Sequence, residues 1–214
     1  MSDGVALLIP VLGRPGNVAP LLKSIRESTP QPYRVLFICD PGDTAEQDAI
    51  AREGGWMISP GGNYAQKIRA GIEATDEPWV FLGADDLRFL PGWFEEATAA
   101  MVNGVQVVGV NDLIDRPERP EHATHFLLTR EAAQLPCIDG RPGPLCDMYR
   151  HWRPDDELIA TALKREMYAY AASAKIKHLH PMTGEAPDDA TYQKGRATAR
   201  MDTRTFYRRQ HLWT

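Results

Sequence analysis

Residues 79–93 of this chain read WVFLGADDLRFLPGW, and the first part of this stretch predicts the centre of an α/β fold. The apolar run 79–82 ends at a glycine and two acids, the pattern of a buried strand that leads into a functional loop. The two acids are Asp85 and Asp86. Open α/β sheets bind ligands just past the carboxyl ends of their strands, and carboxylate oxygens are ligands that Mg²⁺ and Mn²⁺ prefer. An acidic pair can also cap a helix or lie solvated in a loop, so the rest of the chain has to decide between these interpretations.

The residues before this stretch alternate between strand-like and helix-like patterns. Short apolar runs predict strands at 5–11, 34–39, 56–59 and 79–82. The segments between them have caps and helical spacing, which predicts helices at 17–28, 45–54 and 63–74. This alternation is typical of a mostly parallel sheet with helices on both faces.

The residues after the stretch are less regular. We expect helices at 92–102 and 155–164, strands at 105–111, 125–129 and 173–180, and helical sequence from there to the C-terminus. Polar, proline-bearing segments at 112–123 and 135–145 predict loops, and the second could shape an acceptor pocket. With no internal repeat and no obvious linker, we expect one domain over 1–193 and a basic helical extension over 194–214.

The composition excludes several classes of protein. The chain has 214 residues, 43% of them hydrophobic, which is enough for a full core. No run approaches a membrane span, and the N-terminal sequence has no leader-like pattern. Three cysteines, Cys39, Cys137 and Cys146, have neither metal-ligand nor disulfide-framework spacing, so we expect free thiols in a reducing, cytoplasmic setting.

The net charge of −5 is unevenly distributed. Residues 194–214 hold six Lys or Arg and one Asp, a local balance of +5, which leaves −10 on the preceding 193 residues. Arginines recur every four residues in this tail, at 196, 200, 204 and 208, and would share one helix face. A solvated face, or one docked on the acidic body, is the simpler interpretation. The alternative is a surface for an anionic acceptor, a membrane or nucleic acid, and we do not expect nucleic acid as the partner.

The order of these features resembles the GT-A glycosyltransferases, most closely family-2-like enzymes and the short versions found in bacteria and their phages. The resemblance runs from residue 5 to about 192 and depends on four places. They are the first strand with Pro10, Val11 and Arg14; Asp40 after the second strand; the Asn63–Lys67 segment together with the GADD motif at 83–86; and the DDEL motif at 155–158 followed by HLHP at 178–181.

The resemblance implies a site for a nucleotide-sugar donor. It gives Asp40 a contact with the nucleobase, although a turn or cap role would suit this residue equally well. Lys67 would approach the ribose or diphosphate, where a cation makes physical sense, although lysines on helices are usually solvated. The other donor-binding residues that it implies are Pro10, Val11, Arg14, Asn63, Ala84, Asp85 and Asp86.

The implied metal site departs from the family pattern. Family members commonly carry Asp-x-Asp, whereas this chain has Gly83 at the first position and retains only Asp85, followed by Asp86. Asp85 remains the best metal ligand, and a late histidine completes the shell in related enzymes. We expect His180 slightly ahead of His178, because a loop begins there. Imidazole with carboxylate suits Mn²⁺ better than Mg²⁺, so Mn²⁺ (or Mg²⁺) is the expected cofactor.

An inverting transfer also needs a general base near the acceptor hydroxyl. When the DDEL motif is aligned by its leucine with the acidic-helix motif of the family, the resemblance gives this role to Asp155, with Asp156 as the alternate. Helix capping is the structural interpretation of both residues. Trp152 could stack on a sugar ring or form part of the core. Trp93 we assign to packing.

From these residues we expect a metal-dependent glycosyltransferase that moves a sugar from a nucleotide-diphosphate donor, UDP-linked by family tendency, to an acceptor hydroxyl with inversion. The acceptor could be a glycan, a protein, a lipid or a small metabolite. One alternative is a sugar-1-phosphate nucleotidyltransferase, although the segment LGRPGN lacks the basic glycine-rich loop of those enzymes. The other is a non-catalytic module that binds nucleotide or carbohydrate.

Overall fold

The computed structural model describes residues 4–214 and contains one eight-stranded sheet. The strand order across the sheet is β3-β2-β1-β4-β7-β6-β8-β5. The strands are β1 Val5–Pro10, β2 Tyr33–Ile38, β3 Trp56–Ile58, β4 Trp79–Leu82, β5 Leu87–Phe89, β6 Val107–Asn111, β7 Phe126–Thr129 and β8 Tyr168–His178.

Most strands of the sheet point in one direction. The neighbours β3, β2, β1 and β4 are mutually parallel. Because β7 is antiparallel to both β4 and β6, strand β6 points the same way as β4, and β8 is parallel to β6. Only β5 and β7 run against the others. The carboxyl ends of six strands therefore meet at one edge of the sheet, as expected for a mostly parallel α/β fold.

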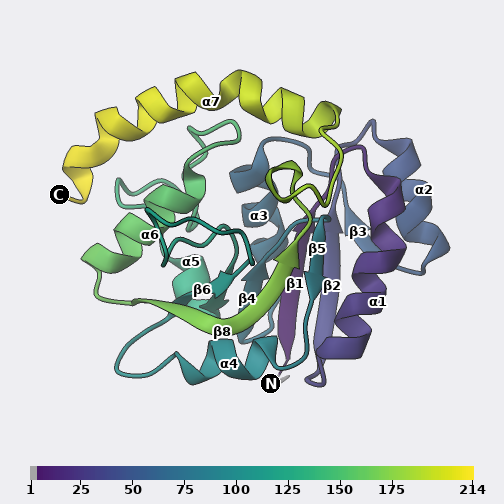
Figure 1. The fold of residues 1–214 in the computed structure, drawn as a ribbon, viewed down its shortest axis with the longest axis horizontal. Coiled ribbons are helices and arrows are strands. Elements are labelled where there is room, and N and C mark those ends of the chain that lie inside the picture. Colours follow the sequence, from purple (N-terminus) through teal and green to yellow (C-terminus); the bar gives the residue numbers. More distant parts are fainter. Residues whose placement is uncertain (1–3) are drawn as a thin grey trace.

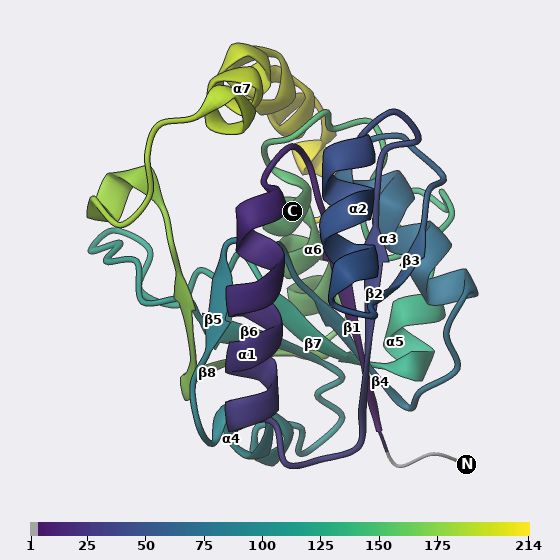
Figure 2. The same cartoon turned by 90° about the vertical axis from the view of Figure 1, so that its right-hand side faces the viewer.

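Helices cover both faces of the sheet. Figures 1 and 2 show α1 and α4 on the opposite side from α3 and α5. The helices are α1 Val18–Ser28, α2 Thr44–Arg52, α3 Tyr64–Glu73, α4 Trp93–Ala99, α5 Arg130–Gln134, α6 Pro154–Lys164 and α7 Ala190–Arg209.

Strand β1 lies at the centre of the core, and its side chains alternate between two apolar layers. Val5, Leu7 and Ile9 pack in the layer that includes α1, α2 and α4. Ala6 and Leu8 pack in the layer that includes α3, α5 and α6. All five are fully buried, which explains why β1 reads as a continuous apolar run and not as an alternating one.

Most elements agree with the sequence-based expectations, including β4 at 79–82 and the three-residue strand β3, but two were not expected. The strand β5 and the five-residue helix α5 were not expected, because neither segment has a recognisable periodic signal. The expected strand at 173–180 is wrong at both ends, since β8 starts at Tyr168 and ends at His178. Trp93 is fully buried and donates from Nε1 to Thr29 Oγ1 at 2.9 Å, which agrees with a packing role.

Helix α7 lies along one rim of the molecule, next to the carboxyl edge of the sheet (Figures 1 and 2). It starts at Ala190, so the expected boundary between residues 193 and 194 lies inside one continuous helix. The division into two units stays a prediction. Among residues 4–214, no helix is long and apolar enough to cross a membrane.

Candidate active site

Arg14 is the centre of a charged cluster at the carboxyl edge of the sheet. It follows β1, and its Nη1 lies 2.7 Å from Asp86 Oδ2 and 3.4 Å from Asp85 Oδ1. The other side of the guanidinium binds Asp189, with Nε 2.7 Å from Oδ2. The ring of Tyr192 packs over the same group, 4.1 Å from its central carbon. The start of α7 therefore closes over Arg14 and the acidic pair.

The loop after β4 holds its acids where the strand ends. Gly83 donates its backbone N–H to Leu8 O at 2.9 Å, which ties the loop to β1. A Cβ at this position would lie 2.8 Å from Ile9 Cδ1 and 3.1 Å from Phe81 Cε1. This close packing leaves little room for a side chain at position 83. Ala84, the expected donor contact in this loop, is half-buried.

The pKa values of the two acids in this loop shift in opposite directions. Both carboxylates are nearly inaccessible to solvent, with 4% and 5% of Asp85 and Asp86 exposed. Burial and the neighbouring Asp86 charge raise the pKa of Asp85. Burial alone would also raise the pKa of Asp86, but the charges of His178 and Arg14 and a hydrogen bond from Tyr192 hold it well below its usual range. Asp86 is therefore the more acidic of the two side chains.

His178, the last residue of β8, lies between two carboxylates. Its Nε2 is 3.5 Å from Asp86 Oδ1 and its Nδ1 is 3.7 Å from Asp112 Oδ2. Asp112 is fixed by Arg116, whose two Nη atoms each lie 2.7 Å from one of its oxygens, and by Thr124. Burial alone would lower the pKa of His178, but the charges of Asp86 and Asp112 raise it to about 9.

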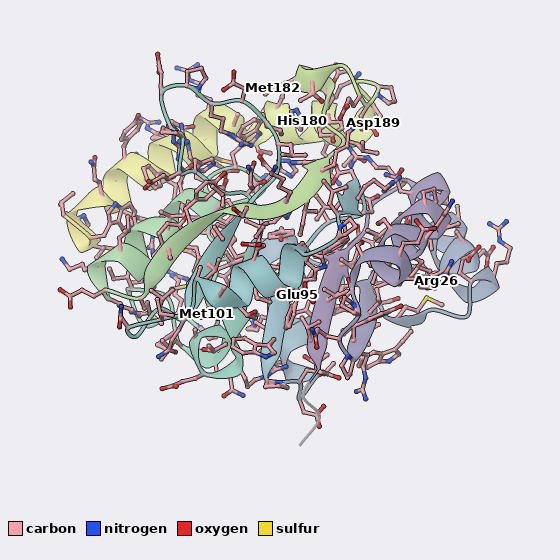
Figure 3. All side chains as sticks on the ribbon, turned by 60° about the horizontal axis from the view of Figure 1, so that its bottom comes forward. Arg26, Glu95, Met101, His180, Met182 and Asp189 are labelled. Atoms are coloured by element: carbon pink, nitrogen blue, oxygen red, sulfur yellow. The ribbon has the colours of Figure 1, made fainter. Side chains whose placement is uncertain are left out.

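His180 has a different environment from His178. It lies beyond β8, and its Nδ1 accepts the Met182 backbone N–H at 3.1 Å. Its ring packs on His178 and Tyr192, with centroids 5.3 and 4.9 Å apart. Figure 3 shows His180, Met182 and Asp189 in one corner of the molecule, away from Arg26 and Glu95. The geometry thus favours His178 over our first choice, His180, as the histidine beside the acidic pair.

The acidic pair fits a divalent cation in its chemistry. Oδ2 of Asp85 and Oδ1 of Asp86 are buried side-chain oxygens without a hydrogen-bond partner in the described structure, and so is Nδ1 of His178. Buried polar atoms are normally satisfied, so the two carboxylate oxygens are available as ligands to a cation. No group of three or more potential ligands is preassembled among residues 4–214. A guanidinium nitrogen of Arg14 occupies the position between the two carboxylates instead.

A second group of expected site residues connects the ends of β1 and β2. Lys67 on α3 is buried, and its Nζ donates to Val11 O at 3.0 Å and pairs with Asp40 Oδ1 at 3.1 Å. Val11 continues the β1 pairing by donating to Ile38 O, and Pro10 ends β1 beside Ile38. Lys67 therefore neutralises Asp40 and holds the loop after β1, and it is not the solvated lysine of the simpler interpretation.

Asn63 acts as a helix cap and as an anchor. Its Oδ1 accepts from Gln66 N, and its own backbone N–H donates to Gln66 Oε1, which completes a capping box on α3. Its Nδ2 donates to Asp147 O at 2.8 Å and Tyr149 O at 3.0 Å. Both amide hydrogens are in use, so Asn63 positions the loop before α6 and has no amide hydrogen left to bind a nucleotide-sugar donor.

Asp155, in the first turn of α6, is the better placed of the two candidate bases. Its Oδ2 lies 3.2 Å from His122 Nε2. The other ring nitrogen, Nδ1, lies 2.7 Å from Arg119 Nη2. A guanidinium can only donate, so Nδ1 accepts and the hydrogen is on Nε2, facing Asp155. Burial raises the pKa of Asp155, but the contact with His122 outweighs it and lowers the pKa below its ordinary value.

Asp156 is already neutralised by cations. Its Oδ2 pairs with Arg153 Nη1 at 3.0 Å, and its Oδ1 contacts the guanidinium of Arg119. Trp152 is 38% exposed and is held through its backbone N–H, which donates to Asp202 at 2.8 Å. Its indole is therefore available for stacking.

Tyr64 contacts the loop that holds Asp85 and Asp86, and it had no assigned role in the sequence-based predictions. Its hydroxyl donates to Gly83 O at 3.1 Å, and burial followed by the charges of Asp155 and Asp86 raises its pKa. Asp112 was also missed, although an acid directly after a strand is the same signal that identified Asp40. No sequence motif pointed to His122, Asp189 or Tyr192. They lie in a loop and near the start of α7, far in sequence from the acids that they contact.

Comparisons with known proteins agree with the fold. No family model and no curated protein matches the sequence. Glucosyl-3-phosphoglycerate synthase from Mycobacterium tuberculosis, solved with Mn²⁺, uridine diphosphate and glucosyl-3-phosphoglycerate, superposes with a TM-score of 0.63 at 14% identity, over 91% of this chain and 76% of that chain. Solved with phosphoglyceric acid, it gives 0.61 at 13%, over 83% and 72%. The likeness shows that this chain has the expected GT-A-like fold.

Proposed function

We propose that this chain is a metal-dependent glycosyltransferase that moves a sugar from a nucleoside diphosphate donor, UDP-linked, to an acceptor hydroxyl with inversion. One observation carries the proposal. Two buried aspartate oxygens without partners, on Asp85 and Asp86, lie at the carboxyl edge of a parallel sheet beside the guanidinium of Arg14. A diphosphate together with its divalent cation matches this pattern of charge.

The donor pocket is assigned to the ends of β1, β2 and β4. Solved structures of the same fold carry UDP-glucose and Mn²⁺. In this chain Asp40, held by Lys67, would contact the nucleobase, and Pro10 and Val11 would line the pocket. Arg14 would exchange an aspartate for the diphosphate, since it is the cation nearest the acidic pair.

The metal is assigned to Asp85, Asp86 and His178, and its binding would displace the proton that the two neighbouring carboxylates stabilise on His178. A bound Mn²⁺ would act as a Lewis acid that neutralises charge on the departing nucleoside diphosphate. Asp112 supports this assignment from outside, because its carboxylate lies 3.7 Å from His178 Nδ1 and leaves Nε2 toward Asp86.

Asp155 is assigned as the general base. As the acceptor oxygen forms its bond to the anomeric carbon, the bond from that carbon to the diphosphate breaks, and Asp155 takes the acceptor proton. His122 holds the carboxylate in its charged form before the reaction. Asp156 is a weaker candidate because two arginines already neutralise it. Trp152 is assigned to the acceptor side.

The proposal also covers the family placement, the domain division and the cellular location of the chain. We place the chain with family-2-like enzymes on its motifs, and treat residues 1–193 as the catalytic unit with 194–214 as an extension. A cytoplasmic setting agrees with three buried cysteines that are all free.

The proposal is tested with a panel of UDP- and GDP-sugars in the presence of Mn²⁺, with release of nucleoside diphosphate as the readout. We expect release from at least one donor, and loss of release in Asp85→Ala but not in the exposed control Asp76→Ala. Donor binding without release would indicate a non-catalytic module. Formation of a nucleotide sugar from a nucleoside triphosphate and a sugar 1-phosphate would indicate a nucleotidyltransferase.

A further inference from the structure

Helix α7 presents a row of arginines on its outer face that the proposed function does not use. Arg200, Arg204 and Arg208 are exposed, and successive members are four residues apart. At 100° per residue each step turns the row by only about 40°, so the three side chains share one side of the helix. The buried residues of α7, Gly195, Asp202 and Arg209, occupy the opposite side.

Within residues 4–214, no acidic side chain forms an ion pair with these three arginines. Within residues 4–214 the α7 arginines with ion-pair partners are Arg196, which pairs with Asp188, and Arg209, which pairs with Glu157 and Asp139. The only acid on α7 is Asp202, which is 1% exposed and accepts three backbone N–H groups from residues 150–152. The row is therefore an open strip of positive charge.

Two large apolar side chains lie within the strip. Tyr207 is 63% exposed and Met201 is 43% exposed. Together with the arginines they line a shallow surface hollow along α7. In both views α7 forms the rim of the molecule, so a flat surface could meet this face without touching the acidic body (Figures 1 and 2).

We propose that the outer face of α7 binds the surface of a bilayer that contains anionic lipid. Arginines flanking exposed apolar side chains are what a helix needs to lie at a membrane interface, where headgroups take the cations and the acyl boundary takes the apolar groups. A nucleic acid would satisfy the arginines, but its phosphate backbone gives Met201 no apolar partner. A long polyanion would also extend over a body that carries a charge of −10, whereas a bilayer plane meets only the rim.

Binding in this orientation has a consequence for the candidate site. The inner side of α7 reaches that site directly, because the Tyr192 hydroxyl donates to Asp86 at 2.7 Å. A helix is about 10–12 Å across, so the bilayer surface would lie roughly that far from the acidic pair. The inference does not depend on the proposed reaction, since it concerns the opposite side of the helix.

The test is flotation of the full chain with vesicles of phosphatidylcholine alone and of phosphatidylcholine mixed with phosphatidylglycerol. We expect binding to the mixed vesicles only, weakening as salt rises from about 0.05 M to about 0.5 M because the charges are screened. Replacement of Arg200, Arg204 and Arg208 by Gln should weaken binding by roughly 100-fold, about fivefold for each arginine. Tyr207→Ser should weaken it several-fold and leave the salt dependence unchanged.

A matched control removes the same charge elsewhere. Lys23, Arg26 and Arg52 are exposed on α1 and α2, and their replacement by Gln should leave vesicle binding unchanged. All six cations are exposed, so melting temperatures should match the wild type. Equal loss in both triple variants would overturn the proposal, because net charge alone would then explain binding. No flotation with mixed vesicles, or arginine-dependent binding to single-stranded nucleic acid in its place, would also overturn it.

Discussion

At the scale of single residues, Asp155 is the candidate general base. Asp155→Asn should lower kcat by roughly 10²- to 10⁴-fold, as for the loss of a general base, and leave donor affinity unchanged. The measurement is a steady-state comparison once a donor and an acceptor are identified. Retained kcat in Asp155→Asn, together with a large loss in Asp156→Asn, would move the base to Asp156.

His122 is the positioning residue for that base. It helps to hold the pKa of Asp155 below its ordinary value, so His122→Leu should raise that pKa. A base must be ionised to accept a proton, so the acid limb of the kcat/KM profile should move to higher pH. His122→Gln keeps a donor near the position of Nε2 and should restore part of the shift. An unmoved acid limb in His122→Leu would contradict the assignment.

Asp112 should affect metal affinity through His178. Residues that orient a metal ligand typically contribute 10- to 100-fold to affinity, so Asp112→Asn should weaken Mn²⁺ binding by about that factor. Titration of Mn²⁺ followed by electron paramagnetic resonance measures this without turnover. Unchanged affinity would mean that His178 does not ligate or does not need this support.

Glu46 on α2 is a buried carboxylate with a stability cost at neutral pH. It is fully buried, its Oε2 accepts the Arg14 backbone N–H at 2.7 Å, and its Oε1 has no partner in the described structure. Burial raises its pKa above the ordinary 4.5. Because the pKa of Glu46 is higher in the folded than in the unfolded protein, its shift contributes stability that is fully present below pH 4.5. This contribution is lost as the pH rises through the folded pKa.

Glu46→Gln should therefore be more stable than the wild type at pH 7, with the difference shrinking toward pH 4.5. Chemical denaturation of both proteins across this range gives the difference directly. A difference that does not vary with pH would show that packing, and not ionisation, separates the two proteins.

At the scale of elements, α7 is fastened by a buried ion pair at its end. Arg209 Nη2 lies 2.6 Å from Glu157 Oε1 on α6, and its Nη1 lies 2.7 Å from Asp139 Oδ2. Tyr149 donates to the same glutamate at 2.6 Å. Removing one partner of such a pair leaves an uncompensated buried charge.

Arg209→Leu should therefore cost about 3–5 kcal/mol of unfolding free energy. The double variant with Glu157→Gln should be more stable than Arg209→Leu alone, because the unpaired charge is gone. Urea unfolding of the three proteins decides the point. Equal stability of wild type and Arg209→Leu would mean that α7 is not held by this pair.

The helices and strands were predicted from the sequence more accurately than the loops. Strands β1, β2 and β4 and helices α1 and α3 were predicted within one or two residues, since each has a local pattern of apolar spacing and caps. The loop holding His122 has no such pattern. Its partner Asp155 lies 33 residues away, and only the folded chain brings the two together.

At the scale of the whole molecule, the site is assembled by contacts that no local pattern encodes. Arg14 meets Asp189 across 175 residues and Asp86 across 72. The sequence predicted the acids and the arginine as separate site residues. It did not predict that the guanidinium would stand between the two carboxylates, because this depends on where α7 begins.

The central claim is that this edge of the sheet binds a nucleoside diphosphate together with a cation. A thermal-shift series with UDP and GDP, each with and without Mn²⁺, on the wild type and on Asp85→Ala tests it most directly. A ligand at about 100 times its Kd adds roughly 2.7 kcal/mol, and each kcal/mol moves Tm by about 2–4 °C in a domain of this size.

We expect one nucleotide to raise the Tm of the wild type only when Mn²⁺ is present, and Asp85→Ala to lose that response relative to its own baseline. If neither nucleotide raises the Tm of the wild type in the presence of Mn²⁺, the donor site does not exist as described and the central claim is wrong.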